Sequence, residues 1–299
     1  MRFLAGYIMR GRLAAILVAA GAAVGSLLAP PLSYISGAAV ALVTLRLGPQ
    51  RGLEVVAGAT AGAALLALAA VGSAVPGLVF AGVLWLPVVV LGWGLRRSAD
   101  PARPLWLAAA FGALAVAGIH GVLTDPAAWW HGHLQAFLGQ VEGEVPAEAL
   151  DQLAGLMTGA AAAGFALTLM GSLLLGRWWQ ALLYNPGGFR QEFHGLRTGR
   201  VAAGTTVVLL VLGPAVGGLV ADLAMVAMAL HLIQGLAVAH GVVGIAGLHG
   251  GWLFALYALV VIRPAEAGLA LALGGLVDNG FDFRGLVARR LGKDSSGGT

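Results

Sequence analysis

Residues 153–176 read LAGLMTGAAAAGFALTLMGSLLLG and contain no charged side chain. A helix of this length and composition can cross a bilayer, because a span needs about 17–25 predominantly apolar residues. Segments of the same kind recur along the whole chain. The sequence therefore predicts an all-α fold, a polytopic integral membrane helix bundle. The apolar segments expected to be helical are 13–28, 32–45, 53–72, 77–95, 105–123, 153–176, 201–220, 223–240, 244–262 and 265–281.

Between eight and ten of these segments are expected to be complete transmembrane helices. Pro30 and Pro31 separate the first two segments, which are short, and Asp278 interrupts the last. The composition agrees with a lipid environment. Only 10% of the 299 residues are charged, whereas a soluble domain carries about 25%, and the mean hydropathy is +0.90.

Glycine is abundant, with 47 residues, as in membrane helices that pack closely. Two glycines four residues apart lie about one turn apart and form a flat stripe that another helix can approach. Such pairs are expected to support a compact bundle, and they occur at Gly21/Gly25, Gly58/Gly62, Gly213/Gly217 and Gly247/Gly251.

The basic residues fix an expected orientation. Sixteen of the seventeen lie in gaps on one side of the series of segments, and the exception is Arg263, which Glu266 can pair on the same helix. The longest gap on the other side, 124–152, carries acidic residues and no basic one. By the positive-inside rule this pattern predicts a multi-pass protein of the bacterial cytoplasmic (inner) membrane with both termini in the cytoplasm.

The expected organisation is one transmembrane helix-bundle domain over 1–283, followed by a cytoplasmic tail at 284–299 that is first basic and then rich in Gly and Ser. The domain has an outer loop at 124–152 and an inner amphipathic loop at 177–200. The lipid bilayer is the expected partner of its apolar surface, and the tail suits an anionic leaflet. Nucleic acid is not expected, because the basic residues are spread over several short loops.

The inner loop is the first candidate for a functional segment. Asn185, Gly187 and Gly188 belong to a turn, after which aromatic residues recur at helical spacing while arginines occupy another face. A short amphipathic helix at the membrane surface is the expected structure. It is either an interfacial anchor or a docking surface for a cytoplasmic or membrane protein subunit, and its candidate docking residues also include Phe189, Arg190, Phe193 and Arg197.

Polar residues inside apolar segments provide the second candidate. His231 and Gln234 are three residues apart and share a helix face, while His240 lies about half a turn out of phase. Polar groups in lipid are costly and usually face the bundle or a cavity. They either hydrogen-bond between helices or line a site for a small molecule or ion. Asp278 is expected to pair with Arg284 and end the last helix.

Motifs of catalysis are missing from the sequence. There is no cysteine, no phosphate-binding loop, no His-Glu-x-x-His, no Gly-x-Ser-x-Gly and no dinucleotide fingerprint. No set of residues has a recognisable metal-ligand spacing. We therefore expect no enzyme, no metal site and no cofactor.

Three stretches together resemble the YybS-like bacterial membrane proteins: the run from Arg177 to Arg197, residues 234–241 (QGLAVAHG) and residues 278–284 (DNGFDFR). The resemblance covers about the C-terminal half. That family is remotely similar to the substrate-binding S-components of energy-coupling-factor transporters and to the cell-shape protein MreD. The resemblance implies either a transport-related protein that binds a small molecule between helices, or a non-transporting membrane scaffold that docks a partner through 177–200.

Overall fold

The structure is a computed structural model that describes residues 1–139 and 146–292. These residues form helices joined by short turns, with no strand among them, so the all-α prediction is confirmed. Residues 140–145 of the predicted outer loop and 293–299 of the predicted tail lie outside the described residues. Contacts divide the chain into unit 1, Met1–Ala108 with Leu167–Phe193, and unit 2, Ala109–Ala166 with His194–Thr299. The single domain predicted over 1–283 therefore contains two compact units.

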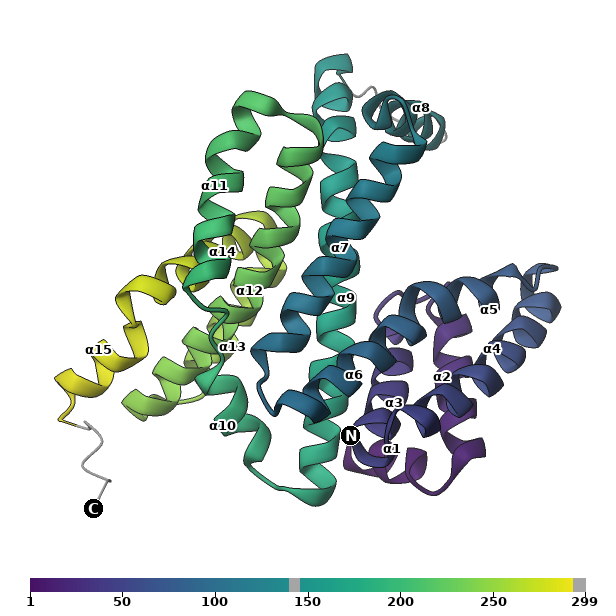
Figure 1. Ribbon diagram of the computed structural model, residues 1–299, viewed down its shortest axis with the longest axis horizontal. Helices are drawn as coiled ribbons and strands as arrows, with labels where there is room; N and C mark the ends of the chain where they lie inside the picture. The colour runs from purple at the N-terminus through teal and green to yellow at the C-terminus, as the bar shows by residue number, and fades with distance from the viewer. Residues whose placement is uncertain (140–145, 293–299) are drawn as a thin grey trace. The chain divides into compact units, whose positions relative to one another are not determined.

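Unit 1 begins with six α-helices, interrupted once by a π-helical turn. Helices α2, α3 and α4 pack against one another (Figure 1). The elements are α1 (Arg2–Ile8), α2 (Arg12–Gly25), α3 (Leu32–Leu47), α4 (Pro49–Val71), α5 (Val75–Val79), the π-helix η1 (Phe80–Trp85) and α6 (Leu86–Ser98).

Helix α3 is the core of unit 1, because every residue from Ser36 to Leu45 is buried. Most of these residues are small or β-branched, which lets neighbouring helices approach closely. Both polar residues of this stretch are hydrogen-bonded, and Thr44 Oγ1 donates to the Val40 carbonyl at 2.8 Å. Trp85 Nε1 donates to Ser36 Oγ at 2.9 Å, and Ser36 Oγ donates to the Ala19 carbonyl at 2.7 Å. The part of α9 that belongs to unit 1 approaches α3 at Gly176, where a side chain would overlap Ala41.

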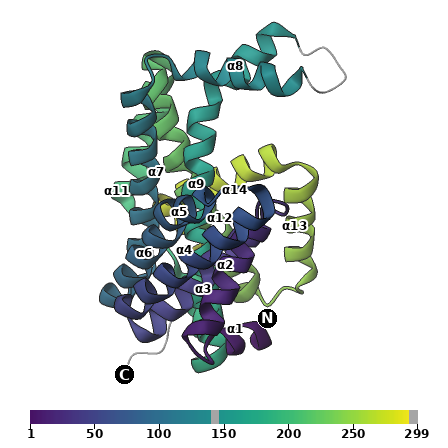
Figure 2. The ribbon, with the colours of Figure 1, turned by 90° about the vertical axis from the view of Figure 1, so that its right-hand side faces the viewer.

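Unit 2 contains most of the remaining helices, and α7, α9 and α10 contribute residues to each unit. Helix α12 packs against α11, α14 and α15. Helix α8 lies across α7 and the unit 2 part of α9 rather than along them (Figure 2). The elements are α7 (Ala102–Val122), α8 (Pro126–Leu138), α9 (Ala147–Tyr184), α10 (Gly188–Gly195), α11 (Arg200–Val216), α12 (Gly218–Ala246), α13 (Gly251–Ile262), α14 (Pro264–Phe281) and α15 (Phe283–Arg290).

Within the described residues, five segments are long and apolar enough to cross a membrane: α4, the run Val75–Ser98, α7, α9 and α12. A sixth arises if α10 and α11, bent by 49°, form one span. Large apolar side chains stay exposed along such helices, and Leu65 on α4 and Val211 on α11 are each 69% exposed. Lipid solvates such surfaces and water does not. These are the helices of a protein that crosses a membrane several times.

The number of long apolar helices is smaller than the eight to ten predicted spans, although every predicted segment contains helix. Helices α2, α3 and α13 are apolar but shorter. The predicted segment 244–262 differs most. Helix α12 continues to Ala246 and ends at Gly247, whose φ of +66° is left-handed, a conformation that suits glycine. Helix α13 starts only at Gly251 and has 12 residues.

The start of the predicted tail also differs from the prediction. Residues expected to begin a tail at 284 instead form α15, which packs against α12. Asp282 caps this helix, since its side chain accepts a hydrogen bond from the Gly285 backbone N–H at 3.0 Å. Arg284 is buried, with 5% of its surface exposed. A buried arginine requires hydrogen-bond acceptors, and those of Arg284 belong to a buried group of polar residues.

Candidate functional site

A buried polar network lies in unit 2 and joins residues from α11, α12, α14 and α15 with the segment that precedes α11. The structure brings together His231 and Gln234 of the predicted polar face and Asp278 and Arg284 of the predicted helix-end pair. Their relative exposures are 0% for His231, Gln234 and Asp278 and 5% for Arg284. The polar network consists of Thr198, Thr206, His231, Gln234, Asp278, Asn279 and Arg284.

Gln234 lies at the centre of the polar network. Its Oε1 accepts from the Thr198 backbone N–H at 2.8 Å and from the Thr198 hydroxyl at 2.5 Å. Its Nε2 donates to Asp278 Oδ2 at 3.1 Å. A backbone N–H can only donate, and a carboxylate can only accept. The two contacts therefore fix the orientation of the amide group.

His231 lies one turn earlier on α12 and hydrogen-bonds to α11. The Thr206 hydroxyl donates to the Ala202 carbonyl at 2.9 Å and lies 2.9 Å from His231 Nε2. Because a hydroxyl has one proton, this arrangement requires Nε2 to carry the imidazole proton. The Thr198 hydroxyl lies 3.4 Å from Nδ1. The proton of that hydroxyl is donated to Gln234 Oε1, so His231 links α12 to α11 through Nε2.

The Asp278–Arg284 ion pair closes the polar network at the ends of α14 and α15. Asp278 Oδ2 accepts from Arg284 Nη2 at 2.7 Å, and Oδ1 accepts from the Phe283 backbone N–H at 3.0 Å. Arg284 Nη1 donates to the carbonyls of His194 at 2.6 Å and Leu196 at 3.0 Å. The guanidinium thus bridges a carboxylate and two backbone carbonyls that belong to the segment before α11.

These contacts fix residues 194–199 against three helices of unit 2. Asn279 adds a further contact, because its Oδ1 accepts from the Gly199 backbone N–H at 2.9 Å. Each polar atom of Gln234, and Nε2 of His231, already has a hydrogen-bond partner in the protein. The polar network can therefore act chemically as a clamp on a backbone segment, with its hydrogen-bonding capacity directed inward.

His240, the third predicted ligand residue, lies apart from the polar network. Its Nδ1 lies 2.8 Å from the Leu236 carbonyl and its Nε2 lies 3.3 Å from the Tyr257 hydroxyl. Its ring also lies near that of His194, with 6.2 Å between the centroids. The structure thus separates His240 from His231 and Gln234, as their helical phase indicates.

The predicted docking residues form the turn and the helix after α9. Asn185 and Gly187 are exposed in the turn, where Gly187 has a φ of +89°, and the Asn185 side chain packs over Gly188. On α10 the rings of Phe189 and Phe193 stack with 5.6 Å between centroids. Arg190 is exposed.

Two ion pairs fasten this region, one in each unit. In unit 1, Arg177 on α9 pairs with Glu192 on α10. In unit 2, Arg197 pairs with Asp282. The Gly285 N–H hydrogen bond, followed by Arg197, lowers the pKa of Asp282 below its ordinary value. Because the folded-state pKa is lowered, this contribution to stability is present at neutral pH and is lost as the pH falls through that pKa.

No protein-family model, curated protein or solved structure matches this chain. The resemblance to the YybS-like proteins therefore stays a prediction. Within the described residues, no three histidine, aspartate or glutamate side chains come together in a group that could hold a metal ion.

Sequence reasoning missed Thr198, Thr206 and Asn279. Thr206 and Asn279 carried a detectable signal, since each is a polar residue inside an apolar segment that requires a partner. Thr198 carried none, because it lies in a polar loop. Sequence reasoning also missed His120 of α7, whose Nε2 lies 2.7 Å from Oδ2 of the buried Asp222 on α12. This second polar pair joins α7 to the start of α12 within unit 2.

Proposed function

We propose that this protein is a non-catalytic scaffold of the bacterial cytoplasmic membrane that docks a cytoplasmic-side protein through residues 185–197. The observation that carries the proposal is the buried polar network, which fixes residues 194–199 at the C-terminal end of that segment. The protein would recognise its partner through α10 and the turn before it, whose exposed groups are polar and basic.

The energetics of the polar network support a role in fixing conformation. Burying an ion pair removes two charges from water, and well-packed apolar residues in its place are often as stable or more stable. A buried ion pair is therefore weak evidence that the polar network serves only to stabilise the fold. Most polar atoms of this network are hydrogen-bonded, which favours one arrangement of the backbone, and Arg284 Nε is buried without a partner among the described residues. A docking segment held in one conformation binds more tightly, because less ordering is needed on association.

The chemistry of α10 favours an acidic partner. Glu192, the acidic residue of this helix, pairs with Arg177 of α9, which leaves Arg190 as an exposed basic group beside Gln191. The Arg46 guanidinium lies 4.1 Å from the centroid of the Tyr184 ring at the end of α9 and holds that end against α3. The docking segment thus presents positive charge, and the end of α9 that precedes it is held in place. A partner surface of complementary charge is acidic.

The transport-related interpretation, with a small molecule bound between helices at His231, Gln234 and His240, has less geometric support. A ligand at Gln234 would have to break an existing hydrogen bond, because each polar atom of its side chain already has a protein partner. His231 is 0% exposed, and its Nε2 is already hydrogen-bonded to Thr206. His240 lies in a separate cluster with Tyr257. The scaffold interpretation requires no change in these contacts.

The docking proposal predicts the result of photocrosslinking in intact cells. With p-benzoylphenylalanine in place of the exposed Gln191, we expect one discrete protein adduct. Arg190→Glu is expected to reduce the adduct by about tenfold or more, the effect of losing an interface arginine. Arg2→Glu is the matched control, because Arg2 is also exposed and basic but lies on α1. Adducts with lipid alone, or an adduct unaffected by Arg190→Glu, would exclude the docking role.

A further inference from the structure

Unit 1 contains a cavity of about 400 Å³ among α1, α2, α3 and α4. That volume lies in the range of about 300–1,000 Å³ that small-molecule sites occupy. One wall is apolar and consists largely of Ile8, Val43 and Val55, which are 1%, 4% and 1% exposed. The cavity is therefore part of the packed core of unit 1 on one side and open on the other.

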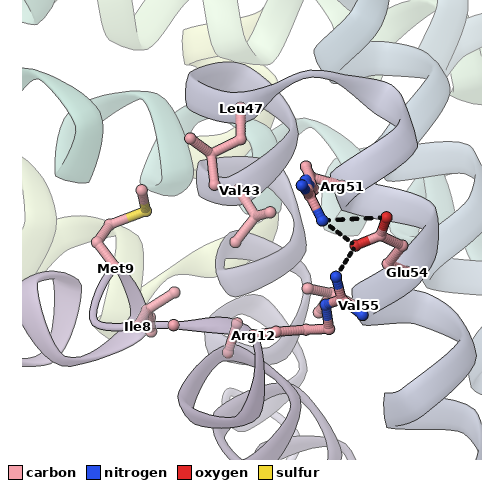
Figure 3. Close-up of a pocket in the computed structure, with 10 residues that line it drawn as sticks. Ile8, Met9, Arg12, Val43, Leu47, Arg51, Glu54 and Val55 are labelled. Carbon is pink, nitrogen blue, oxygen red and sulfur yellow. Dashed lines mark hydrogen bonds and ion pairs between the residues drawn. The ribbon is translucent and has the colours of Figure 1, made fainter.

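The open side carries three charged side chains in mutual contact. Arg12 of α2 approaches Glu54 of α4, with 2.7 Å between Nη2 and Oε2. Arg51 of α4 binds the same carboxylate through Nη1, at 2.9 Å from Oε2 and 3.3 Å from Oε1 (Figure 3). The triad of Arg12, Arg51 and Glu54 has two positive charges and one negative charge. The mouth of the cavity therefore has an excess positive charge.

The triad keeps unused hydrogen-bond donors. Arg12 uses Nη2 and Arg51 uses Nη1, and their other guanidinium nitrogens donate to no described residue. The side chains are 57% and 54% exposed, so their pairing with Glu54 contributes little to stability. Guanidinium groups bind carboxylates and phosphates in fork-like geometry. The triad therefore has hydrogen-bond donors available for an incoming anion, while its own ion pairs add little to the stability of the fold.

We propose that this cavity binds an anionic amphiphile, with its phosphate or carboxylate on Arg12 and Arg51 and its apolar body against Ile8, Val43 and Val55. The position of the cavity in the membrane fits such a molecule, because Arg12 and Arg51 lie at the helix ends that the charge pattern assigns to the cytoplasmic surface. A charged head at the surface and an apolar body directed into the bundle is the arrangement of any amphiphile in a bilayer. An anionic phospholipid and a free amphipathic acid share this chemistry.

The test uses the full-length protein in phosphatidylcholine nanodiscs, titrated with dodecyl phosphate and followed by calorimetry. We expect saturable binding that dodecyltrimethylammonium, with the same chain and the opposite charge, does not show. The double variant Arg12→Gln/Arg51→Gln, which lacks both guanidinium groups, measures the nonspecific partition of dodecyl phosphate into the bilayer. Arg51→Gln alone is expected to weaken binding by about tenfold or more, because it removes a charge-assisted hydrogen bond. A wild-type titration that superimposes on that of the double variant would overturn the proposal.

Glu54→Gln separates charge recognition from a structural role of the triad. Both Glu54→Gln and Arg51→Gln break the triad, but only Glu54→Gln removes the competing carboxylate. We expect Glu54→Gln to tighten dodecyl phosphate binding several-fold, whereas a triad that acts only by holding α2 to α4 would lose binding in both variants. Repeating the titration with phosphatidylglycerol in the nanodiscs identifies the source. Competition indicates a lipid, and undiminished binding indicates a free acid.

Discussion

Arg284→Met is expected to lower the free energy of unfolding by about 3–5 kcal/mol, the effect of leaving a buried charge without its partner. Methionine keeps an unbranched, flexible side chain but removes the guanidinium. Asp278 is 0% exposed and would lose its contact with Arg284 Nη2. The carbonyls of His194 and Leu196 would lose a donor in the same step. The measurement is equilibrium unfolding in mixed micelles.

Two controls accompany this prediction. Asp278→Asn combined with Arg284→Met removes both charges, so it is expected to recover part of the loss, because no unpaired ion remains buried. Arg263→Met breaks the Arg263–Glu266 pair, which has Nε–Oε1 at 2.9 Å but side chains 63% and 59% exposed. That variant is expected to stay within about 1 kcal/mol of the wild type. If Arg284→Met matched Arg263→Met, the polar network would not depend on its ion pair.

The fold was predictable wherever composition alone decides the outcome. Apolar segments become helices in lipid, because every backbone group must be satisfied within the segment. Helix ends were less predictable. The break between α12 and α13 depends on Gly247 adopting a left-handed conformation, and Gly244, a residue of the same type three positions earlier, stays inside α12. The residue type alone does not distinguish the two positions.

The polar network was predictable only in part. The helical phase places His231 and Gln234 on one face, and that inference needs no tertiary information. The partners of Gln234 could not be inferred in the same way, because Thr198 is 36 residues away and contributes a backbone N–H. The carbonyls that accept from Arg284 belong to His194 and Leu196, about 90 residues earlier in the chain. Backbone groups carry no sequence signal, so sequence alone cannot find such contacts.

Glycine spacing shows the same limit. Of the four predicted pairs, Gly58 and Gly62 both face another helix, at Ile16 and Ala20 of α2. A Cβ at Gly21 or Gly247 would meet nothing within 4 Å. In unit 2, Gly235 of α12 lies against the backbone of α14 and belongs to no predicted pair. Spacing on one helix does not indicate where a second helix will cross it.

Gly235→Ala is expected to be the second large effect, with a loss of about 3 kcal/mol in the free energy of unfolding. A Cβ at Gly235 would overlap the backbone carbonyl of Leu271 on α14, and a Cβ at Gly275 would overlap that of His231. The two helices therefore touch backbone to backbone. Overpacking costs about 1–3 kcal/mol, and the upper end applies here because backbone atoms cannot rotate away. The shift of α14 would also move Asp278, three residues after Gly275, and weaken the polar network.

Gly275→Ala, which causes the corresponding overlap from α14, is expected to be destabilising as well. Gly274→Ala, one residue earlier on the same helix, is the matched control. A Cβ at Gly274 meets nothing within 4 Å. Alanine also favours helix over glycine by about 1 kcal/mol, so this variant is expected to be neutral or slightly stabilising. Two neighbouring glycines of α14, each replaced by alanine, should therefore shift the unfolding midpoint in opposite directions. Equal shifts for Gly274→Ala and Gly275→Ala would mean that α12 and α14 do not meet at Gly235 and Gly275, and the clamp on residues 194–199 would lose its rigid base.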